Sequence, residues 1–134
     1  MMLLVFRLRS GPFEGPAIVK PPALPEDIYF DFFDIVYSRN SLDHCHDPIK
    51  GLDQMISVTK PGGYVVIEGI RNEAIHENWI GMHNFNFDTD DTGDFIISNK
   101  IKKYSVKTQF KKKVSLKTKI NKSWLVVIIR KLED

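Results

Sequence analysis

Two short apolar runs on either side of one amphipathic segment constrain the fold of this chain more than any other feature of its sequence. Residues 33–37 (FDIVY) and 64–70 (YVVIEGI) are almost continuously apolar, as expected of strands covered on both faces of a parallel sheet. Between them, apolar residues recur at helical spacing and predict a helix over residues 48–59. A strand, a helix and a second strand in this order form a right-handed βαβ unit, so we expect the two strands to be parallel.

Both ends of the predicted helix carry recognisable signals. Asp47 is a good N-cap, because its side chain can accept a hydrogen bond from the first turn, and Pro48 suits the first helical position. Residues 60–63 (KPGG) are expected to stop the helix and to reverse the chain before the second strand.

The chain on either side of this unit is less regular. Residues 1–9 predict a short strand, and residues 11–25 hold five of the seven prolines, which indicates an extended loop that serves as a linker. Residues 71–94 are polar and irregular. Short strands are expected at four later segments: residues 95–98, 106–110, 114–120 and 124–129.

Composition narrows the class of protein. With 134 residues, of which 43% are hydrophobic and 27% charged, the chain has room for one globular domain, and its net charge of +2 indicates no particular partner. The single cysteine, Cys45, excludes an internal disulfide and fits a reducing compartment. The apolar run at the start is six residues long, too short for a secretory signal or a membrane span. We therefore expect a cytoplasmic protein without a membrane partner.

Four motifs, in order, resemble the second half of the class I S-adenosylmethionine-dependent methyltransferase core. They are residues 33–36 (FDIV), 40–44 (NSLDH), 47–48 (DP) and 60–63 (KPGG), and residues 81–87 (GMHNFNF) resemble a further stretch of a bacterial branch. The resemblance, to a type 11 methyltransferase-like domain, implies an α/β fold. We expect a partial Rossmann-like methyltransferase sheet in which parallel strands are followed by antiparallel closing strands. Residues 1–25 would be a degenerate or linker segment, and residues 26–134 the carboxyl-terminal portion of the domain.

The resemblance also implies roles for the loop after the first strand of the βαβ unit. Asn40, Ser41 and Leu42 would border S-adenosylmethionine, because ligands of such sheets lie beyond the carboxyl ends of the parallel strands. Asp43 and His44 would face the reacting centre, where His44 could remove a proton from the acceptor. The alternative is that Asp43 caps the helix together with Asp47 and that the histidines are solvated.

The first half of the family's core is largely missing. Gly11 would belong to its glycine-rich cofactor loop, but Arg9 and Phe13 stand where further glycines are expected. The interval before residue 33 is too short for the strand that carries the ribose-binding acid. We therefore expect an incomplete cofactor pocket, impaired activity, and an open sheet edge at residues 33–38 through which the chain could self-associate.

Methyl transfer from S-adenosylmethionine to a small-molecule or sugar-type acceptor is the expected function. The rival from another class is a non-catalytic interaction module that retains only the sheet scaffold, since a fold alone does not determine function. Binding of S-adenosylmethionine discriminates between the two.

Three other sequence patterns indicate a function less strongly. Residues 44–47 (HCHD) are adjacent, and adjacent residues rarely ligate one zinc ion. His76 and His83 could add ligands, but nothing in the sequence fixes their geometry, so we expect no metal. Nothing marks Cys45 as a nucleophile. Residues 88–94 hold four aspartates without the spacing of a calcium loop and predict a solvated turn.

Ten lysines and no acidic residue lie between residues 100 and 122. They could contact nucleic-acid phosphates, in which case the affinity would fall steeply with salt. Their alternation with apolar residues better fits the solvent-facing side of edge strands, so we expect no nucleic-acid partner.

Overall fold

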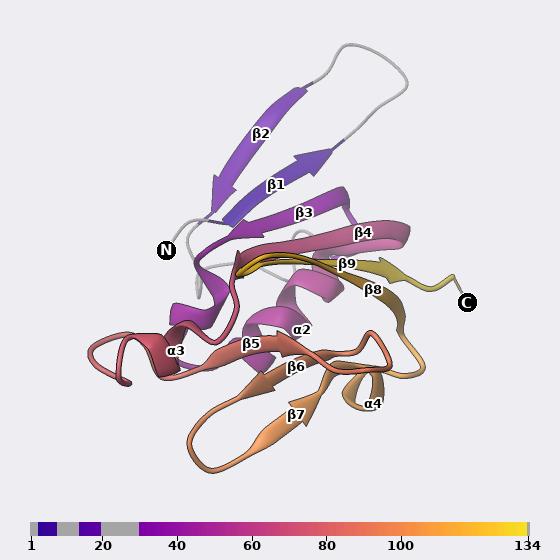
Figure 1. Cartoon of the computed structure of the whole chain (residues 1–134). Coiled ribbons are helices and arrows are strands. Elements are labelled where there is room, and N and C mark those ends of the chain that lie inside the picture. Colours follow the sequence, from indigo (N-terminus) through magenta and orange to yellow (C-terminus); the bar gives the residue numbers. More distant parts are fainter. Residues whose placement is uncertain (1–2, 8–13, 20–29, 134) are drawn as a thin grey trace.

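A computed structural model describes residues 3–7, 14–19 and 30–133, with side chains described from residue 30 onward. A six-stranded sheet has the order β2-β1-β3-β4-β9-β8. Its strands are β1 (Leu3–Arg7), β2 (Glu14–Val19), β3 (Phe33–Arg39), β4 (Thr59–Ile70), β8 (Val114–Asn121) and β9 (Trp124–Lys131). A second, three-stranded sheet consists of β5 (Asn86–Thr89), β6 (Phe95–Ser98) and β7 (Lys103–Ser105). The helical elements are η1 (Leu42–His44), α2 (Pro48–Val58), α3 (Glu73–His76) and α4 (Val106–Gln109). In Figure 1, α2 lies between the two sheets.

The βαβ unit is confirmed. Strands β3 and β4 pair in parallel, with Val36 opposite Val65, and α2 connects them. The helix begins as predicted, because the Asp47 carboxylate accepts a hydrogen bond of 3.1 Å from the backbone N–H of Lys50 and Pro48 occupies the first turn. Local sequence signals were sufficient here, since the cap and the buried stripe both belong to one continuous segment.

Residues 60–63 form a bulge inside β4 rather than a separate turn. Thr59 pairs with Phe33, and Tyr64 then pairs with Ile35, so several extra residues of β4 lie opposite one residue of β3. The chain therefore begins to pair as soon as α2 ends. A side chain at Gly63 has no room, because its Cβ would lie 2.7 Å from the carbonyl oxygen of Asp34.

We expect Gly63→Ala to lower the free energy of unfolding by about 1–3 kcal/mol, because the new methyl group would press on backbone that is held by the sheet. Gly69→Ala is the matched control in the same strand, since its Cβ would meet no atom closer than 3.5 Å. Urea denaturation followed by circular dichroism measures both. Equal stability of the two variants would contradict a steric role for Gly63.

The amino-terminal strands correct two expectations. Strand β1 pairs antiparallel with β3, with Leu3 opposite Ser38 and Phe6 opposite Ile35, so the sheet edge expected to be open is paired. Strand β2 pairs with β1 and lies within the segment expected to be an extended linker. It contains Pro16, which an outermost strand tolerates because one of its sides has no ladder hydrogen bonds to lose. The strand predicted within residues 1–9 is confirmed.

Three of the four later strand predictions are confirmed as β6, β8 and β9, although β6 belongs to the second sheet. Residues 106–109 are instead the short helix α4. The Ser105 hydroxyl accepts a hydrogen bond from the N–H of Thr108 (3.1 Å), and the Asp94 carboxylate accepts one from the N–H of Lys107 (2.9 Å). These two caps outweigh the weak strand pattern of only five residues.

The aspartate-rich turn is partly solvated. Asp90 is exposed and accepts hydrogen bonds from the N–H groups of Thr92 and Asp94, which closes the turn between β5 and β6. Asp94, in contrast, is buried against α4, which contradicts the expectation of a fully solvated turn.

The core joins both sheets and α2. The buried apolar residues form one cluster, to which α2 contributes Leu52 and Met55 and the second sheet contributes Phe87, Phe95 and Ile97. Lys117 and Lys119 point to solvent from β8 at the sheet's edge, as the alternation predicted.

Strand β3, expected to be covered on both faces, has only one fully buried face. Val36 is inaccessible to solvent, whereas Ile35 and Tyr37 on the opposite face stay partly exposed. The result is an α/β fold with a partial Rossmann-like sheet, in which the parallel pair β3–β4 is followed by the antiparallel strands β9 and β8. Within the described ranges, no helix is long and apolar enough to cross a membrane.

Candidate functional site

The loop after β3 is held against the end of β4. The N–H of Asn40 donates a hydrogen bond of 2.7 Å to the carbonyl of Glu68, and Asn40 adopts a positive φ of 46°. Asparagine tolerates this left-handed conformation better than most residues. Gly69 leaves space beside it, since a Cβ there would lie 3.5 Å from the Asn40 side-chain oxygen. Asn40 therefore lies at the carboxyl end of the parallel pair, as predicted.

Ser41 and Leu42 fix the course of this loop. Both are buried, and the Ser41 and Ser38 hydroxyls share a hydrogen bond of 2.8 Å. Leu42 packs on α2 at Gly51, where a Cβ would lie 2.9 Å from the leucine methyl group. The buried side chains of Ser41 and Leu42 thus hold in place the backbone that leads to Asp43 and His44.

The alternative in which Asp43 caps the helix and His44 is solvated is wrong. Asp47 alone provides the side-chain cap of α2, and Asp43 lies in η1 with 4% of its surface exposed. The His44 side chain is 20% exposed, and its Nε2 lies 3.3 Å from Glu73 Oε2 and 3.7 Å from Asp43 Oδ2. His44 therefore belongs to a partly buried ionisable cluster, whereas His46 is exposed.

Burial raises the pKa of Asp43 to about 6. A hydrogen bond with Glu73 and repulsion between the two carboxylates act in the same direction, and the nearby His44 opposes them in part. Two carboxylates and one imidazole thus lie close together at this end of the sheet, an arrangement that is common where proton transfer or cation binding takes place.

Glu73 reaches His44 because the segment after β4 is anchored to β5. Arg71 Nε donates to one oxygen of Asp88 at 2.7 Å, and the Asn72 amide donates to the other at 3.0 Å. Burial raises the pKa of Asp88, but these two hydrogen bonds, a third from the Thr89 N–H and the charge of Arg71 together lower the pKa overall. The ionised Asp88 therefore holds the start of α3, which carries Glu73.

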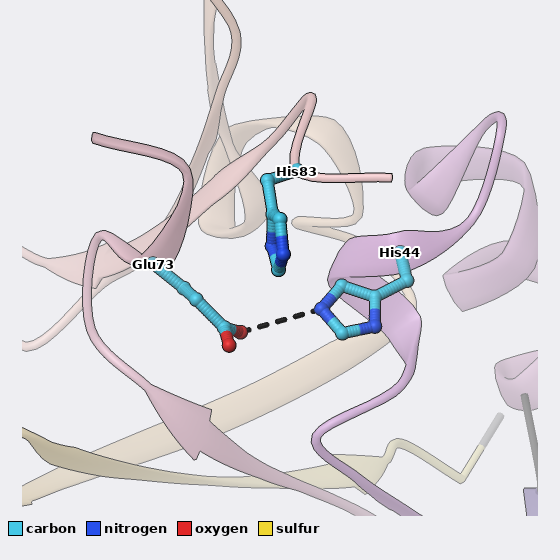
Figure 2. A group of neighbouring side chains, drawn as sticks. All are labelled: His44, Glu73 and His83. Atoms are coloured by element: carbon cyan, nitrogen blue, oxygen red, sulfur yellow. Dashed lines mark hydrogen bonds and ion pairs between the residues drawn. The ribbon is translucent and has the colours of Figure 1, made fainter. Parts of the chain in front are cut away.

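His83 completes the cluster (Figure 2). Its ring stands at 90° to that of His44, with 5.0 Å between the ring centroids. His44, Glu73 and His83 each offer one nitrogen or oxygen atom, and these atoms all lie within 4.8 Å of one another. His83 Nδ1 is buried and has no hydrogen-bond partner within the part of the chain that the structure describes.

A cavity of about 450 Å³ opens beside this cluster. It is lined by His44, by His76 at the end of α3, and by residues 77–78 and 80–83 of the loop after α3. The loop exposes the apolar side chains of Ile80 and Met82. A small organic molecule could therefore reach His44 from solvent.

The contiguous residues Asn40, Ser41, Leu42, Asp43 and His44 follow the carboxyl end of β3, and their roles in a site stay predictions. The sequence provided no reason to single out Glu73, and His83 was considered only as a ligand beside the run at residues 44–47. Neither residue has a spacing signal, because Glu73 is 29 residues from His44 along the chain. Only the return of the chain through α3 and the following loop places them at the end of β3.

Two other expected features have different outcomes. Gly11 lies outside the described residues. Strand β1 runs antiparallel to β3, so its amino end, at Leu3, lies beside Ser38 near the carboxyl end of β3. The carboxyl end of β1 therefore lies away from Asn40. Burial raises the pKa of the Cys45 thiol to about 11, which agrees with the expectation that Cys45 is not a nucleophile.

A profile of the methyltransferase domain family matches residues 13–110. Among solved structures, the chain is similar to the PH0226 protein from Pyrococcus horikoshii OT3, with 12% sequence identity and a TM-score of 0.42. The alignment covers 77% of this chain and 56% of that protein, so the chain spans little more than half of its length. No curated protein matches the chain significantly.

Proposed function

Because the chain belongs to the methyltransferase domain family, we propose that it transfers the methyl group of S-adenosylmethionine to a small-molecule or sugar-type acceptor. One observation carries the proposal. The loop of Asn40, Ser41 and Leu42, at the carboxyl end of the parallel pair, leads directly into the cluster around His44. A cofactor beside the loop and an acceptor in the cavity would therefore be neighbours.

Asn40, Ser41 and Leu42 suit one wall of a cofactor site. Asn40 presents its amide beside Gly69, where the absence of a side chain keeps the strand end open, and Leu42 offers a buried apolar contact. S-adenosylmethionine supplies a sulfonium-activated methyl group when bound. The contribution of this wall is then to orient the cofactor relative to the acceptor.

His44 is the residue we assign to the acceptor's proton. If Nε2–H of His44 donates to Glu73, the other ring nitrogen, Nδ1, is the one that accepts a proton. Glu73 fixes this tautomer and stabilises the imidazolium that forms, and Asp43 holds Glu73 in turn. General-base assistance of this kind accelerates the removal of a hydroxyl proton during methyl transfer.

We expect calorimetric titration to detect micromolar binding of S-adenosylmethionine, and Asn40→Gly to weaken it by about 2- to 10-fold. The variant keeps the positive φ and removes one hydrogen-bonding side chain, whose net contribution is about 0.5–1.5 kcal/mol. Asn78→Gly is the matched control, because Asn78 also has a positive φ but lies in the loop after α3.

Absence of binding by the unaltered chain would overturn the proposal and favour an interaction module. Equal weakening by the two glycine variants would instead remove Asn40 from the cofactor wall.

A further inference from the structure

We propose that His44, Glu73 and His83 bind a divalent transition-metal ion of the zinc type, with one ligand atom from each side chain. The three ligands come from η1, from α3 and from the loop that follows it. Figure 2 shows the three side chains directed toward a common point. The proposal concerns metal binding alone, and its test does not depend on methyl transfer.

The spacing of the ligand atoms fits such an ion. Zinc lies about 2.0–2.1 Å from nitrogen and oxygen ligands, and tetrahedral geometry then places two ligand atoms about 3.3–3.4 Å apart. His44 Nε2 and Glu73 Oε2 are already 3.3 Å apart, and all three ligand atoms lie within 4.8 Å of one another. A small rotation of the side chains, without movement of the backbone, would complete the site.

His83 gives the second, independent reason. A hydrogen bond between His44 and Glu73 would satisfy those two residues without any ion, but it leaves His83 Nδ1 buried and unpaired within the described residues. A buried polar atom without a partner is costly, so its presence calls for a ligand. Coordination by Nδ1 would supply the missing partner.

The donor set selects the class of metal. Two imidazoles and one carboxylate suit zinc and its transition-metal neighbours, whereas magnesium and calcium prefer oxygen ligands throughout. The cavity lined by His44 and His83 leaves room for a further ligand on the open side. Asp43, which hydrogen-bonds Glu73, occupies the place of an outer partner that orients a ligand.

Metal binding would alter how the cluster handles a proton. A bound ion would engage His44 through Nε2, and Nδ1 would then carry the ring proton, so His44 can act as the base assigned above only in the metal-free chain.

Titration of the full chain with Co²⁺, after treatment with a chelator, tests the proposal through the visible absorption of the bound ion. Competition with Zn²⁺ then measures zinc affinity. We expect one ion per chain, and a loss of affinity of more than about 100-fold in His83→Ala, because a direct ligand should matter more than an outer partner. His46→Ala is the matched control, since His46 is exposed and lies outside the cluster.

Two further variants separate lost ligation from lost folding. Glu73→Gln keeps the shape of the side chain and should also weaken binding strongly, and Asp43→Asn should weaken it by about 10- to 100-fold. Circular dichroism verifies that each variant folds. Absence of binding by the unaltered chain, unchanged affinity in a folded His83→Ala or Glu73→Gln, or an equal loss in His46→Ala would overturn the proposal.

Discussion

Replacing His44 by glutamine should lower kcat for methyl transfer by about 100- to 10,000-fold, the usual contribution of a general base. Glutamine keeps a polar side chain beside Glu73 but cannot accept a proton from the acceptor. The KM for S-adenosylmethionine should change little, because Asn40, Ser41 and Leu42 remain in place. Transfer of a labelled methyl group to sugar-type acceptors by the chelator-treated, metal-free chain measures both constants.

His46→Gln is the control for this experiment. His46 is a histidine two residues further along the chain, but it is exposed and outside the cluster, so its replacement should leave kcat unchanged. A folded His44→Gln variant with full activity would remove His44 from the proton-transfer step. Absence of turnover by the unaltered chain with every acceptor would count against the proposed function as a whole.

Replacing Phe95 by alanine should lower the free energy of unfolding by about 3–5 kcal/mol, because the truncation leaves a cavity in the core that joins the two sheets. The Phe95 side chain is fully buried and packs edge to face on Phe87, with 4.9 Å between the ring centroids. Urea denaturation followed by circular dichroism measures the loss. Ile101→Ala, at a side chain that is 94% exposed, should change stability by less than about 0.5 kcal/mol.

The Phe95→Ala variant also tests whether packing of the second sheet holds Glu73 in position. Phe95 pairs with Thr89 at the end of β5, and β5 carries Asp88, which anchors Arg71 and Asn72 before Glu73. If the second sheet loosens, Glu73 should lose its fixed distance to His44. A loss of stability below about 1 kcal/mol in Phe95→Ala would show that the second sheet is not held by this core.

The part of the site between β3 and α2 follows largely from local sequence. The βαβ unit, the Asp47 cap and the loop from Asn40 to His44 are contiguous, and short-range signals such as apolar runs and caps suffice to predict them. The pairing of β1 with β3 could not be predicted in the same way. Its register joins strands separated by the proline-rich segment, and nothing local specifies that pairing.

By itself, the sequence determined that a parallel strand ends just before Asn40 and leads into the loop of Asn40, Ser41, Leu42, Asp43 and His44. Only the tertiary structure decided which side chains lie next to His44. Glu73 and His83 approach it because the Asp88 hydrogen bonds to Arg71 and Asn72 anchor the start of α3 and because the following loop returns to η1. Neither residue adjoins His44 in sequence. Their convergence depends on packing between distant segments, which no periodicity or motif along the chain records.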